Sequence, residues 1–293
     1  MGFKLFLFIE KLLMLLPKKF RKQFFLLLAN IAYFVSSSSR KTVRQNLNFA
    51  FNSKLTEEEI KEITKYSFKN LMLNFLHLME IRHMSLDELK SKVKVENIEV
   101  VNKAHAEGKS IIYVTTHYSS WELGGASISA LIEPLGAVYK KMKNKQYQEW
   151  VLESRAKFGN INLEKTNVIK PLIKLIKDKT ACGILIDTNI KKKDGLEVMF
   201  MGKTLRQTST PAFLARKFDA VIIPVAMRTD DEDNYTLMLF DEIVVEKTDD
   251  AKADIFKATQ LQADWLSSLI KKEPKFWFWL HRRFKGDHPH IYN

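Results

Sequence analysis

The sequence has very few cysteine, proline and glycine residues. It holds one cysteine, Cys182, with 7 prolines and 10 glycines among 293 residues. A single cysteine excludes an internal disulfide and any zinc site built from several cysteines. Cys182 lies in the apolar run 181–186, so we expect it to be buried. With 46% apolar and 28% charged residues, the chain is neither disordered nor collagen-like. We expect an ordered globular protein that faces the cytosol.

Several common sequence motifs are also missing. There is no Gly-x-Ser-x-Gly elbow, no Gly-x4-Gly-Lys-Ser/Thr loop, no Gly-x-Gly-x-x-Gly fingerprint and no His-Glu-x-x-His pair. These absences argue against a serine hydrolase, a P-loop nucleotidase, a dinucleotide-binding enzyme and a zinc protease. His281, His288 and His290 lie in a basic C-terminal stretch, and we predict no metal site there.

Positive charge is concentrated at the N-terminus. The formal net charge is +13, and residues 1–45 contribute +8 of it, with Glu10 as their one acid. Basic proteins favour anionic partners such as nucleic acid, acidic lipid or an acidic protein. The basic side chains of residues 1–45 are Lys4, Lys11, Lys18, Lys19, Arg21, Lys22, Arg40, Lys41 and Arg44.

The same N-terminal region is strongly apolar, in residues 3–16 and 24–35. Neither stretch reaches the roughly 20 residues that a bilayer-spanning helix needs. Lys4, Lys11 and Lys18 recur every seven residues, which on a helix places them opposite an apolar face containing Phe6, Leu12, Leu13 and Leu16. This pattern predicts helices lying in an anionic membrane surface. The alternative is a buried N-terminal helix pair of a soluble domain.

Beyond residue 45 the sequence alternates between helical and strand patterns. Thr56 to Glu59 resembles a capping box, and apolar residues then recur at helical spacing to about Glu80. Alternation of this kind predicts an α/β fold with a central mixed, mostly parallel sheet flanked by helices. We expect two regions, membrane-associating helices in 1–45 and a catalytic α/β domain in 46–293. The predicted strands are 95–101, 110–116, 137–139, 181–187, 220–227 and 235–240, and the later predicted helices are 146–158, 168–178, 211–217 and 253–271.

The segment after the strand 110–116 holds the most promising chemistry. His117 follows the strand, and Glu122 comes five positions later in the first turn of a predicted helix. A histidine with a carboxylate partner can act as a general base on a hydroxyl. This spacing occurs easily by chance, and His83 with Glu88 repeats it in a turn without a preceding strand. Residues beyond the carboxyl ends of strands form the sites of open α/β sheets, which favours His117 and Glu122.

The block 116–124, Thr-His-Tyr-Ser-Ser-Trp-Glu-Leu-Gly, resembles the His-x4-Asp/Glu signature of the glycerolipid and lysophospholipid acyltransferase superfamily. Its Trp-Glu form resembles the late acyltransferases of lipid A biosynthesis. The likeness extends over about residues 40–285 and departs from the family at Ser209, where a glycine is expected, and in the lysine loop 191–193. Further blocks that match in order are 40–47 with Phe51 and Glu80, 138–139, 155–159, Asp187, 200–202, Thr208 with 211–212, 223–224 and 279–285.

This resemblance implies an O-acyltransferase that needs no metal or redox cofactor. Such enzymes move a fatty acyl chain from an acyl carrier protein thioester to a hydroxyl on a hydroxyacyl chain of a lipid A precursor, without an acyl-enzyme. His117 would deprotonate the hydroxyl and Glu122 would orient His117. Arg155 would neutralise the oxyanion or a substrate phosphate, and Asp187 would pair with Arg155 or position a substrate.

Three further residues are candidate substrate contacts. Lys203 and Arg206 would bind phosphate, with Thr208 beside them in the third matching block. For each of these residues, as for Arg155 and Asp187, an ordinary structural or surface role is the alternative. The aromatic and basic residues 276–285 would suit a membrane interface, and the alternative for this cluster is the edge of an aromatic core.

The resemblance also implies partners and a location. The partners would be an acyl carrier protein, a lipid A precursor and anionic inner-membrane lipid, with no nucleic acid. The location would be the cytoplasmic face of the inner membrane, with the chain attached to one side or through a single anchor. A phospholipid or glycolipid acyltransferase is the nearest alternative function, and an inactive membrane scaffold or a nucleic-acid-binding protein are more distant ones.

Overall fold

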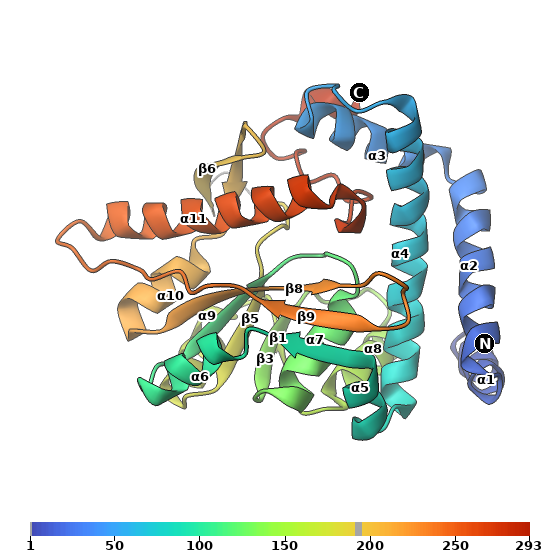
Figure 1. The fold of residues 1–293 in the computed structure, drawn as a ribbon, viewed down its shortest axis with the longest axis horizontal. Helices are drawn as coiled ribbons and strands as arrows, with labels where there is room; N and C mark the ends of the chain where they lie inside the picture. Colours follow the sequence, from blue (N-terminus) through green and yellow to red (C-terminus); the bar gives the residue numbers. More distant parts are fainter. Residues whose placement is uncertain (1, 191–194) are drawn as a thin grey trace.

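The computed structural model describes residues 2–190 and 195–293, and the centre of this part of the chain is a mixed sheet (Figure 1). Seven of the described strands form it in the order β1-β9-β8-β2-β5-β3-β4. Only β8 and β9 pair antiparallel, while the other neighbours are parallel. The strands are β1 (Val93–Glu96), β2 (Ile111–Thr115), β3 (Leu135–Tyr139), β4 (Ile161–Glu164), β5 (Ala181–Leu185), β8 (Val221–Arg228) and β9 (Tyr235–Leu239).

Helices cover both faces of the sheet, because the central strands are apolar on both sides. On β2, Ile112 and Val114 belong to one apolar cluster, and Ile111 and Tyr113 belong to another. The first cluster includes side chains of α9 (Ile169–Lys177), α10 (Thr210–Phe218) and α11 (Ala251–Lys272). The second includes side chains of α5 (Leu86–Lys92), α6 (Glu99–Ala106) and α7 (Trp121–Leu131). Helix α8 (Lys145–Ala156) packs beside α7 and β4.

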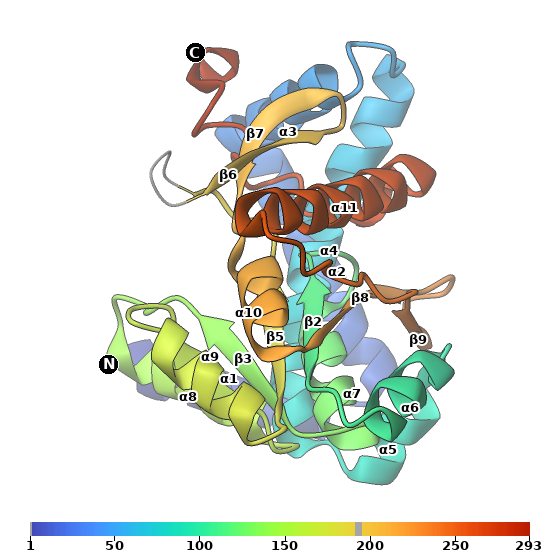
Figure 2. The same ribbon diagram turned by 90° about the vertical axis from the view of Figure 1, so that its left-hand side faces the viewer.

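Smaller elements complete the C-terminal half. Strands β6 (Leu196–Phe200) and β7 (Lys203–Gln207) form a separate antiparallel hairpin against α11 (Figure 2). Two short 3-10 helices, η2 (Pro274–Phe276) and η3 (Pro289–Tyr292), follow α11. Cys182 on β5 is buried, as predicted, and burial raises the pKa of its thiol to about 12.

Helix α4 (Glu57–His83) crosses one end of the sheet and supports the N-terminal helices (Figure 1). Its start is the predicted capping box, in which Thr56 Oγ1 accepts from the Glu59 backbone N–H and Glu59 accepts from the Thr56 N–H. The helix continues three residues beyond the predicted end at Glu80. Its buried face carries polar residues as well as leucines, among them Asn74, His77 and Glu80.

The N-terminal helices are α1 (Gly2–Leu15), α2 (Lys18–Val35) and α3 (Ser37–Ala50). Two buried charges fasten the first two to the rest of the protein. Arg21 of α2 donates to Glu80 of α4 from Nε and Nη2, at 3.2 and 3.0 Å. Glu10 of α1 accepts from Trp150 Nε1 of α8 at 2.8 Å, and its other oxygen lies 3.1 Å from His83 Nε2.

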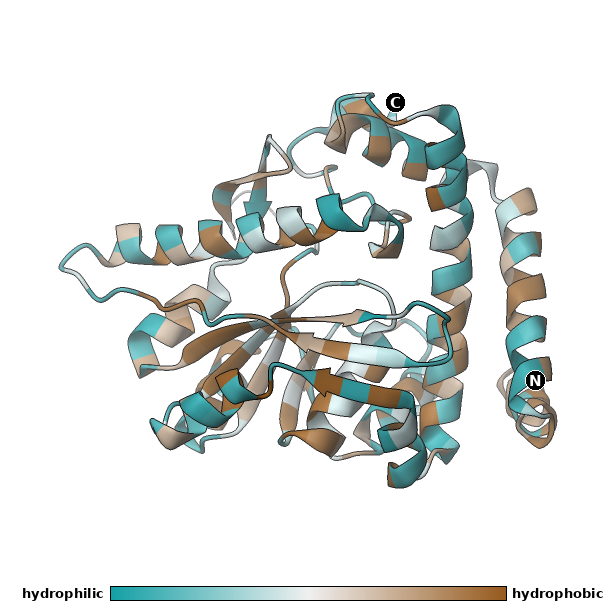
Figure 3. Cartoon of the chain, viewed as in Figure 1, coloured by the Kyte–Doolittle hydropathy of each residue, from teal (hydrophilic) through white to brown (hydrophobic). Residues whose placement is uncertain are grey.

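The outer face of α1 and α2 carries many exposed apolar side chains. Hydrophobic residues, brown in Figure 3, recur along both helices among hydrophilic ones. More than half of the exposed large apolar side chains in the described residues lie in this pair, including Phe8 at 58% and Phe34 at 73% exposure. Phe6 and Leu13, which we expected on the membrane-facing side, instead pack against the protein beside Trp150. The pair therefore combines both sequence-based alternatives, with an inner face buried on α4 and α8 and an outer face left open.

The predicted α/β class with a mixed, mostly parallel sheet is confirmed. The predicted strand 95–101 is wrong, because β1 ends at Glu96 and α6 begins at Glu99. Helix α3 continues past residue 45, and the division into two regions there stays a prediction. In the described part of the chain, no helix is both long enough and apolar enough to cross a membrane. Helices α3 and α5 and strands β4, β6 and β7 were not predicted.

The interface proposed for the aromatic cluster 276–279 is wrong for most of its members. Phe276, Trp277 and Trp279 are at most 2% exposed, because they pack into the larger apolar core beside Phe200 and Tyr66. Phe278 alone is partly exposed.

Replacing Arg21 should destabilise the fold strongly. Arg21→Ala leaves the carboxylate of Glu80 buried without its main partner, so the free energy of unfolding should fall by about 3 kcal/mol in urea denaturation. Arg44→Ala is the matched control, since Arg44 pairs with Glu57 at the surface and should contribute less than about 1 kcal/mol. Equal losses in the two variants would contradict the role assigned to the buried pair.

Candidate active site

The candidate site lies at the carboxyl ends of β2 and β5. These neighbouring strands are parallel, with Thr115 opposite Leu185, so the residues that follow them meet at one edge of the sheet. His117 comes two residues after β2, and Asp187 comes two residues after β5. The sequence placed both residues at strand ends, and the structure brings them together.

The imidazole of His117 is hydrogen-bonded to Asp187. Its Nδ1 lies 2.9 Å from Asp187 Oδ1. An ionised carboxylate only accepts hydrogen bonds, so Nδ1 carries the proton and Nε2 is left as the basic nitrogen. The side chain is 27% exposed. A fixed tautomer with an accessible basic nitrogen is what a general base requires.

The environment adjusts the pKa of both partners. Burial alone would lower the pKa of His117, but the charge and hydrogen bond of Asp187 outweigh it, and the net pKa lies above the ordinary histidine value. For Asp187, burial opposes ionisation, but His117 and the hydrogen-bond donors around the carboxylate hold its pKa well below the usual range. The carboxylate therefore stays ionised, and the imidazole is a stronger base than a free histidine.

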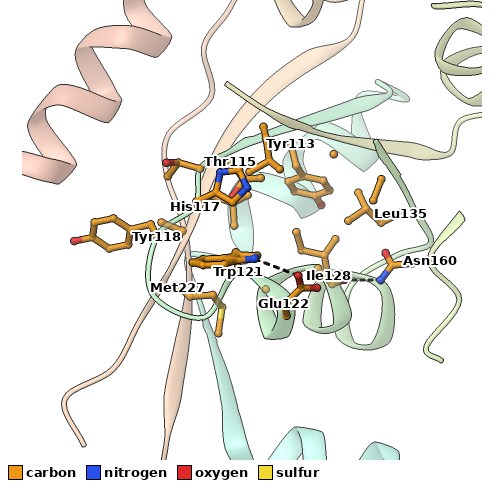
Figure 4. A pocket seen from close by; sticks show the side chains of 18 of the residues that line it. Tyr113, Thr115, His117, Tyr118, Trp121, Glu122, Ile128, Leu135, Asn160 and Met227 are labelled. Carbon is orange, nitrogen blue, oxygen red and sulfur yellow. Dashed lines mark hydrogen bonds between the residues drawn. The ribbon is translucent and has the colours of Figure 1, made fainter. Parts of the chain in front are cut away.

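Glu122 pairs with Arg155. Arg155 donates from Nε to Oε2 at 2.9 Å and from Nη2 to Oε1 at 2.7 Å, a bidentate arrangement. Trp121 Nε1 also donates to Oε1, at 3.2 Å, along a dashed line in Figure 4. Burial would raise the pKa of Glu122, but the charge and hydrogen bonds of Arg155 lower it below the ordinary value. Glu122 is therefore ionised and its charge is compensated by Arg155.

These contacts correct the pairing inferred from the resemblance. Among the described residues, no hydrogen bond joins Glu122 to His117. Asp187, which the resemblance paired with Arg155, is instead hydrogen-bonded to His117. The partners of the two carboxylates are therefore the reverse of those inferred: Asp187 pairs with His117, and Glu122 pairs with Arg155. His117 follows a strand and Glu122 begins the next helix, so the short turn between them brings both side chains to one cavity. Each of the two is nevertheless bonded to a different partner, His117 to Asp187 and Glu122 to Arg155.

The turn between His117 and Glu122 is held by helix α4. Asn74 Nδ2 donates to the Ser119 carbonyl at 2.9 Å, and Ser119 has a positive φ of 49°. Ser120 Oγ lies 2.6 Å from Nδ1 of His77. Both α4 residues are almost fully buried, and burial lowers the pKa of His77 well below the ordinary value, which keeps it neutral. Sequence analysis missed this pair, although polar residues three positions apart on the apolar face of a helix were a usable signal.

An apolar cavity opens beside His117, between α7 and the sheet (Figure 4). Its cavity volume is about 120 Å³, and the empty space around it reaches about 900 Å³ when the part that is open solvent is included. Alternate strand residues form one wall, since successive side chains of a strand point to opposite faces. Gly125 contributes to the opposite wall, and a methyl group added there would meet only Asn160, at 4.0 Å. The main lining residues are Tyr113, Thr115, Leu135, Ala137, Gly183, Leu185, Val225, Met227 and Leu237 from the sheet, Trp121, Glu122, Gly124 and Ile128 from α7, and Arg155 and Asn162.

Two aromatic rings flank His117 near the mouth of the cavity. The Trp121 ring centroid lies 5.3 Å from that of His117, and the Phe278 centroid lies 5.9 Å away. Trp121 and Phe278 also contact each other, at 5.4 Å. Their rings limit the movement of the imidazole, and Trp121 also lines the cavity.

The predicted phosphate contacts lie elsewhere, on the hairpin β6–β7. Lys203 donates to Asn52, Arg206 pairs with Glu197, and Thr208 donates to Thr210. None of the three lines the cavity beside His117. Their substrate role stays a prediction without support from this geometry. The lysine loop 191–193 lies outside the described residues.

The histidine, cysteine and carboxylate side chains of residues 2–190 and 195–293 are scattered with respect to metal binding. No group of three or more His, Cys, Asp or Glu side chains there is placed to hold a metal ion. His288, one of the C-terminal histidines, lies 2.6 Å from the Thr204 carbonyl through its Nε2.

A basic imidazole beside an apolar cavity can activate a hydroxyl next to an apolar substrate. The model of the family described as bacterial lipid A biosynthesis acyltransferase matches residues 1–286. The chain belongs to this family and is an O-acyltransferase. The resemblance noted in its sequence blocks is thereby confirmed.

Individual relatives are distant. The chain is 25% identical to a lipid A biosynthesis palmitoleoyltransferase of Escherichia coli K12, over 83% of this chain and 77% of the relative. It is 22% identical to a lipid A biosynthesis lauroyltransferase of the same organism, over 84% and 78%. It is also 22% identical to a phosphatidylinositol mannoside acyltransferase of Mycolicibacterium smegmatis, over 70% and 66%.

Asp187→Asn should impair acyl transfer severely and change its pH dependence. The amide no longer fixes the productive tautomer, so kcat should fall by about 10³-fold or more. Because Asp187 raises the pKa of His117, its loss should move the acid limb of the pH profile to lower pH. The limb marks protonation of the base, which is active only when neutral. Rates measured from pH 5 to 9 test this, and an unchanged limb would contradict the assignment of Asp187 as the partner of His117.

Proposed function

We propose that this enzyme transfers a fatty acyl group from an acyl carrier protein thioester to a hydroxyl on a hydroxyacyl chain of a lipid A precursor of the Kdo-lipid IVA type. The observation that carries the proposal is the His117–Asp187 pair at the mouth of the apolar cavity. Membership of the lipid A biosynthesis acyltransferase family supports this acceptor.

His117 acts as the general base in this proposal. Its Nε2 takes the proton of the acceptor hydroxyl while the oxygen attacks the thioester carbonyl carbon. A carbon–oxygen bond forms and the carbon–sulfur bond breaks. The proton on Nε2 then passes to the departing thiolate, which restores neutral His117 and leaves the carrier protein as a free thiol. Asp187 stabilises the imidazolium between these two proton transfers.

The cavity holds the acyl chain of the donor. Its walls are mainly the apolar faces of β2, β3, β5, β8 and α7, which favour a hydrocarbon chain over water. Gly125 leaves open space in one wall. The charged pair Glu122–Arg155 lies at the side of the cavity as a nearly neutral unit. In this proposal Arg155 offers the N–H groups that do not contact Glu122 to the carbonyl oxygen that becomes negative during attack.

The exposed face of α1 and α2 attaches the enzyme to the cytoplasmic surface of the inner membrane. Apolar side chains of this face, such as Phe8, Leu15 and Phe34, are largely exposed, and the neighbouring Lys4, Lys11 and Lys19 are exposed as well. Apolar insertion combined with cationic contacts is how interfacial helices bind anionic bilayers. Attachment of this kind brings the site to a lipid acceptor that stays in the membrane.

A glycolipid acceptor is the second candidate, because the phosphatidylinositol mannoside acyltransferase is among the similar proteins. The two are separated by mass spectrometry of each acceptor after incubation with the purified enzyme and a mixture of acyl carrier protein thioesters. We expect the tetra-acylated lipid A precursor to gain the mass of one acyl chain.

His117→Ala should reduce this product by about 10³-fold, since it removes the base. Folding of the variant is checked by circular dichroism. Product formed at the wild-type rate would remove His117 from the mechanism. Product formed only on the mannosylated lipid would replace the lipid A acceptor with the glycolipid.

Membrane attachment is tested without removing the buried contacts of α1 and α2. The variant Phe8→Glu, Leu15→Glu, Phe34→Glu changes three exposed side chains of the outer face and should weaken binding to phosphatidylglycerol vesicles by roughly tenfold or more in sedimentation. The control Val244→Glu, Phe256→Glu, Leu261→Glu changes three exposed apolar side chains outside α1 and α2. Equal binding by both variants would show that α1 and α2 do not attach the enzyme.

A further inference from the structure

The segment after α11 crosses the candidate site, and we name residues 273–284 the C-terminal strap. Its backbone is bonded directly to the turn that carries His117. The Ser119 N–H donates to the Phe276 carbonyl at 2.8 Å, and the Phe278 N–H donates to the His117 carbonyl at 2.9 Å. Between these two hydrogen bonds, Tyr118 and Trp277 face each other as an isolated antiparallel β-bridge.

The indole of Trp277 points at the buried carboxylate. Its Nε1 lies 3.0 Å from Asp187 Oδ2 and 3.1 Å from Thr116 Oγ1. Trp277 is 2% exposed, so this N–H is shielded from water. A charge-assisted hydrogen bond in such a place is stronger than one between neutral groups.

The donors divide the two oxygens of Asp187 between different tasks. Oδ2 receives Thr116 Oγ1 at 2.7 Å and the His117 backbone N–H at 2.9 Å, in addition to Trp277. Oδ1 accepts from the imidazole of His117. Three donors on one oxygen fix the rotation of the carboxylate, so the other oxygen is held in the plane and direction that His117 requires. Trp277 is the donor among the three that comes from outside the Thr116–His117 segment.

The strap is itself anchored on its far side. Asn46 of α3 is fully buried and donates from Nδ2 to the carbonyls of Trp279 and His281, at 2.7 and 2.8 Å. Arg283 donates from Nη1 to the Thr188 carbonyl at 3.0 Å, next to Asp187. Trp277 is therefore held by groups on both sides of it and has little freedom to turn away.

We propose that Trp277 is a positioning residue of the acyltransferase reaction, which acts by fixing the orientation of Asp187 and through it His117. The inference rests on the proposed function of the His117–Asp187 pair and extends it to the C-terminal strap. By burial alone, Trp277 is an ordinary residue of the apolar core. The hydrogen bond to Asp187 is what distinguishes it from the other buried aromatic residues.

The test compares Trp277→Phe with Trp279→Phe. Trp279 is equally buried, lies 4.6 Å from Trp277 between ring centroids, and donates its Nε1 to the Pro274 carbonyl at 2.7 Å. Each variant loses one indole N–H. The N–H of Trp277 is shared between Asp187 and Thr116, whereas that of Trp279 contacts only the Pro274 carbonyl. Trp277→Phe should lower kcat about tenfold with KM unchanged. Trp279→Phe should leave kcat within about twofold of wild type.

The pH dependence provides a second readout that a structural role would not change. Asp187 raises the pKa of His117, so a carboxylate that is no longer held toward the imidazole should stabilise the imidazolium less, and the pKa of His117 should fall in Trp277→Phe. The acid limb of the pH profile then moves to lower pH, and NMR titration of His117 without substrate should show the same shift. Glu122 and Arg155, the other charges acting on His117, are the same in both variants.

Each outcome decides between the proposals. If both tryptophan variants retain kcat and the His117 titration, the positioning role is refuted while acyl transfer by the wild type still supports the proposed function. If the wild type transfers no acyl group to any lipid, the proposed function fails, and the titration alone still tests the contact. If Trp277→Phe does not fold, benzothienylalanine at position 277 keeps the ring shape and removes only the N–H. An unchanged titration with this analogue would overturn the inference.

Discussion

The carboxylate of Asp187 is the group on which the candidate site depends most. Removing a charged carboxylate from water costs several kcal/mol unless hydrogen bonds and an opposite charge replace the lost hydration. Here the end of β2, the imidazole of His117 and the C-terminal strap supply those partners. The site therefore forms only when β2, β5 and the strap are all in place, which links its geometry to completion of the fold.

Helix α4 connects this site with the exposed N-terminal helices. On one side Asn74 and His77 hold the turn that follows His117. On another, Glu80 accepts from Arg21 of α2. The polar groups on the buried face of α4 thus hold the catalytic turn and helix α2 at a fixed distance from each other. The proposed function needs this, because the membrane surface that binds α1 and α2 delivers the acceptor to the cavity. A helix of 27 residues is long enough to reach both (Figures 1 and 2).

Periodicity predicted the central fold well because the signals were local. The β-branched run around Ile112 and the capping box at Thr56 specify their own elements, and parallel pairing follows from alternation with helices. Strand ends also led to His117 and Asp187. The pairing of charges was not predictable in this way, since Arg155 and Asp187 are each far in sequence from their partners. The prediction of a membrane interface at residues 276–279 was wrong because aromatic composition does not distinguish a core from an interface. The difference depends on which distant segments pack against these residues.

The separation of the two carboxylates explains why a glutamate five positions after His117 is useful without touching it. Glu122 lies in the first turn of α7, where the helix dipole favours a negative charge. Its side chain reaches the cavity, where an isolated charge would oppose an apolar chain, and Arg155 compensates that charge. Asp187 supplies the second negative group, directed at the imidazole. In the proposed mechanism, Asp187 adjusts the basicity of His117, while Glu122 holds the cation of Arg155 beside the same cavity. The short spacing between His117 and Glu122 is what places base and cation on that one cavity.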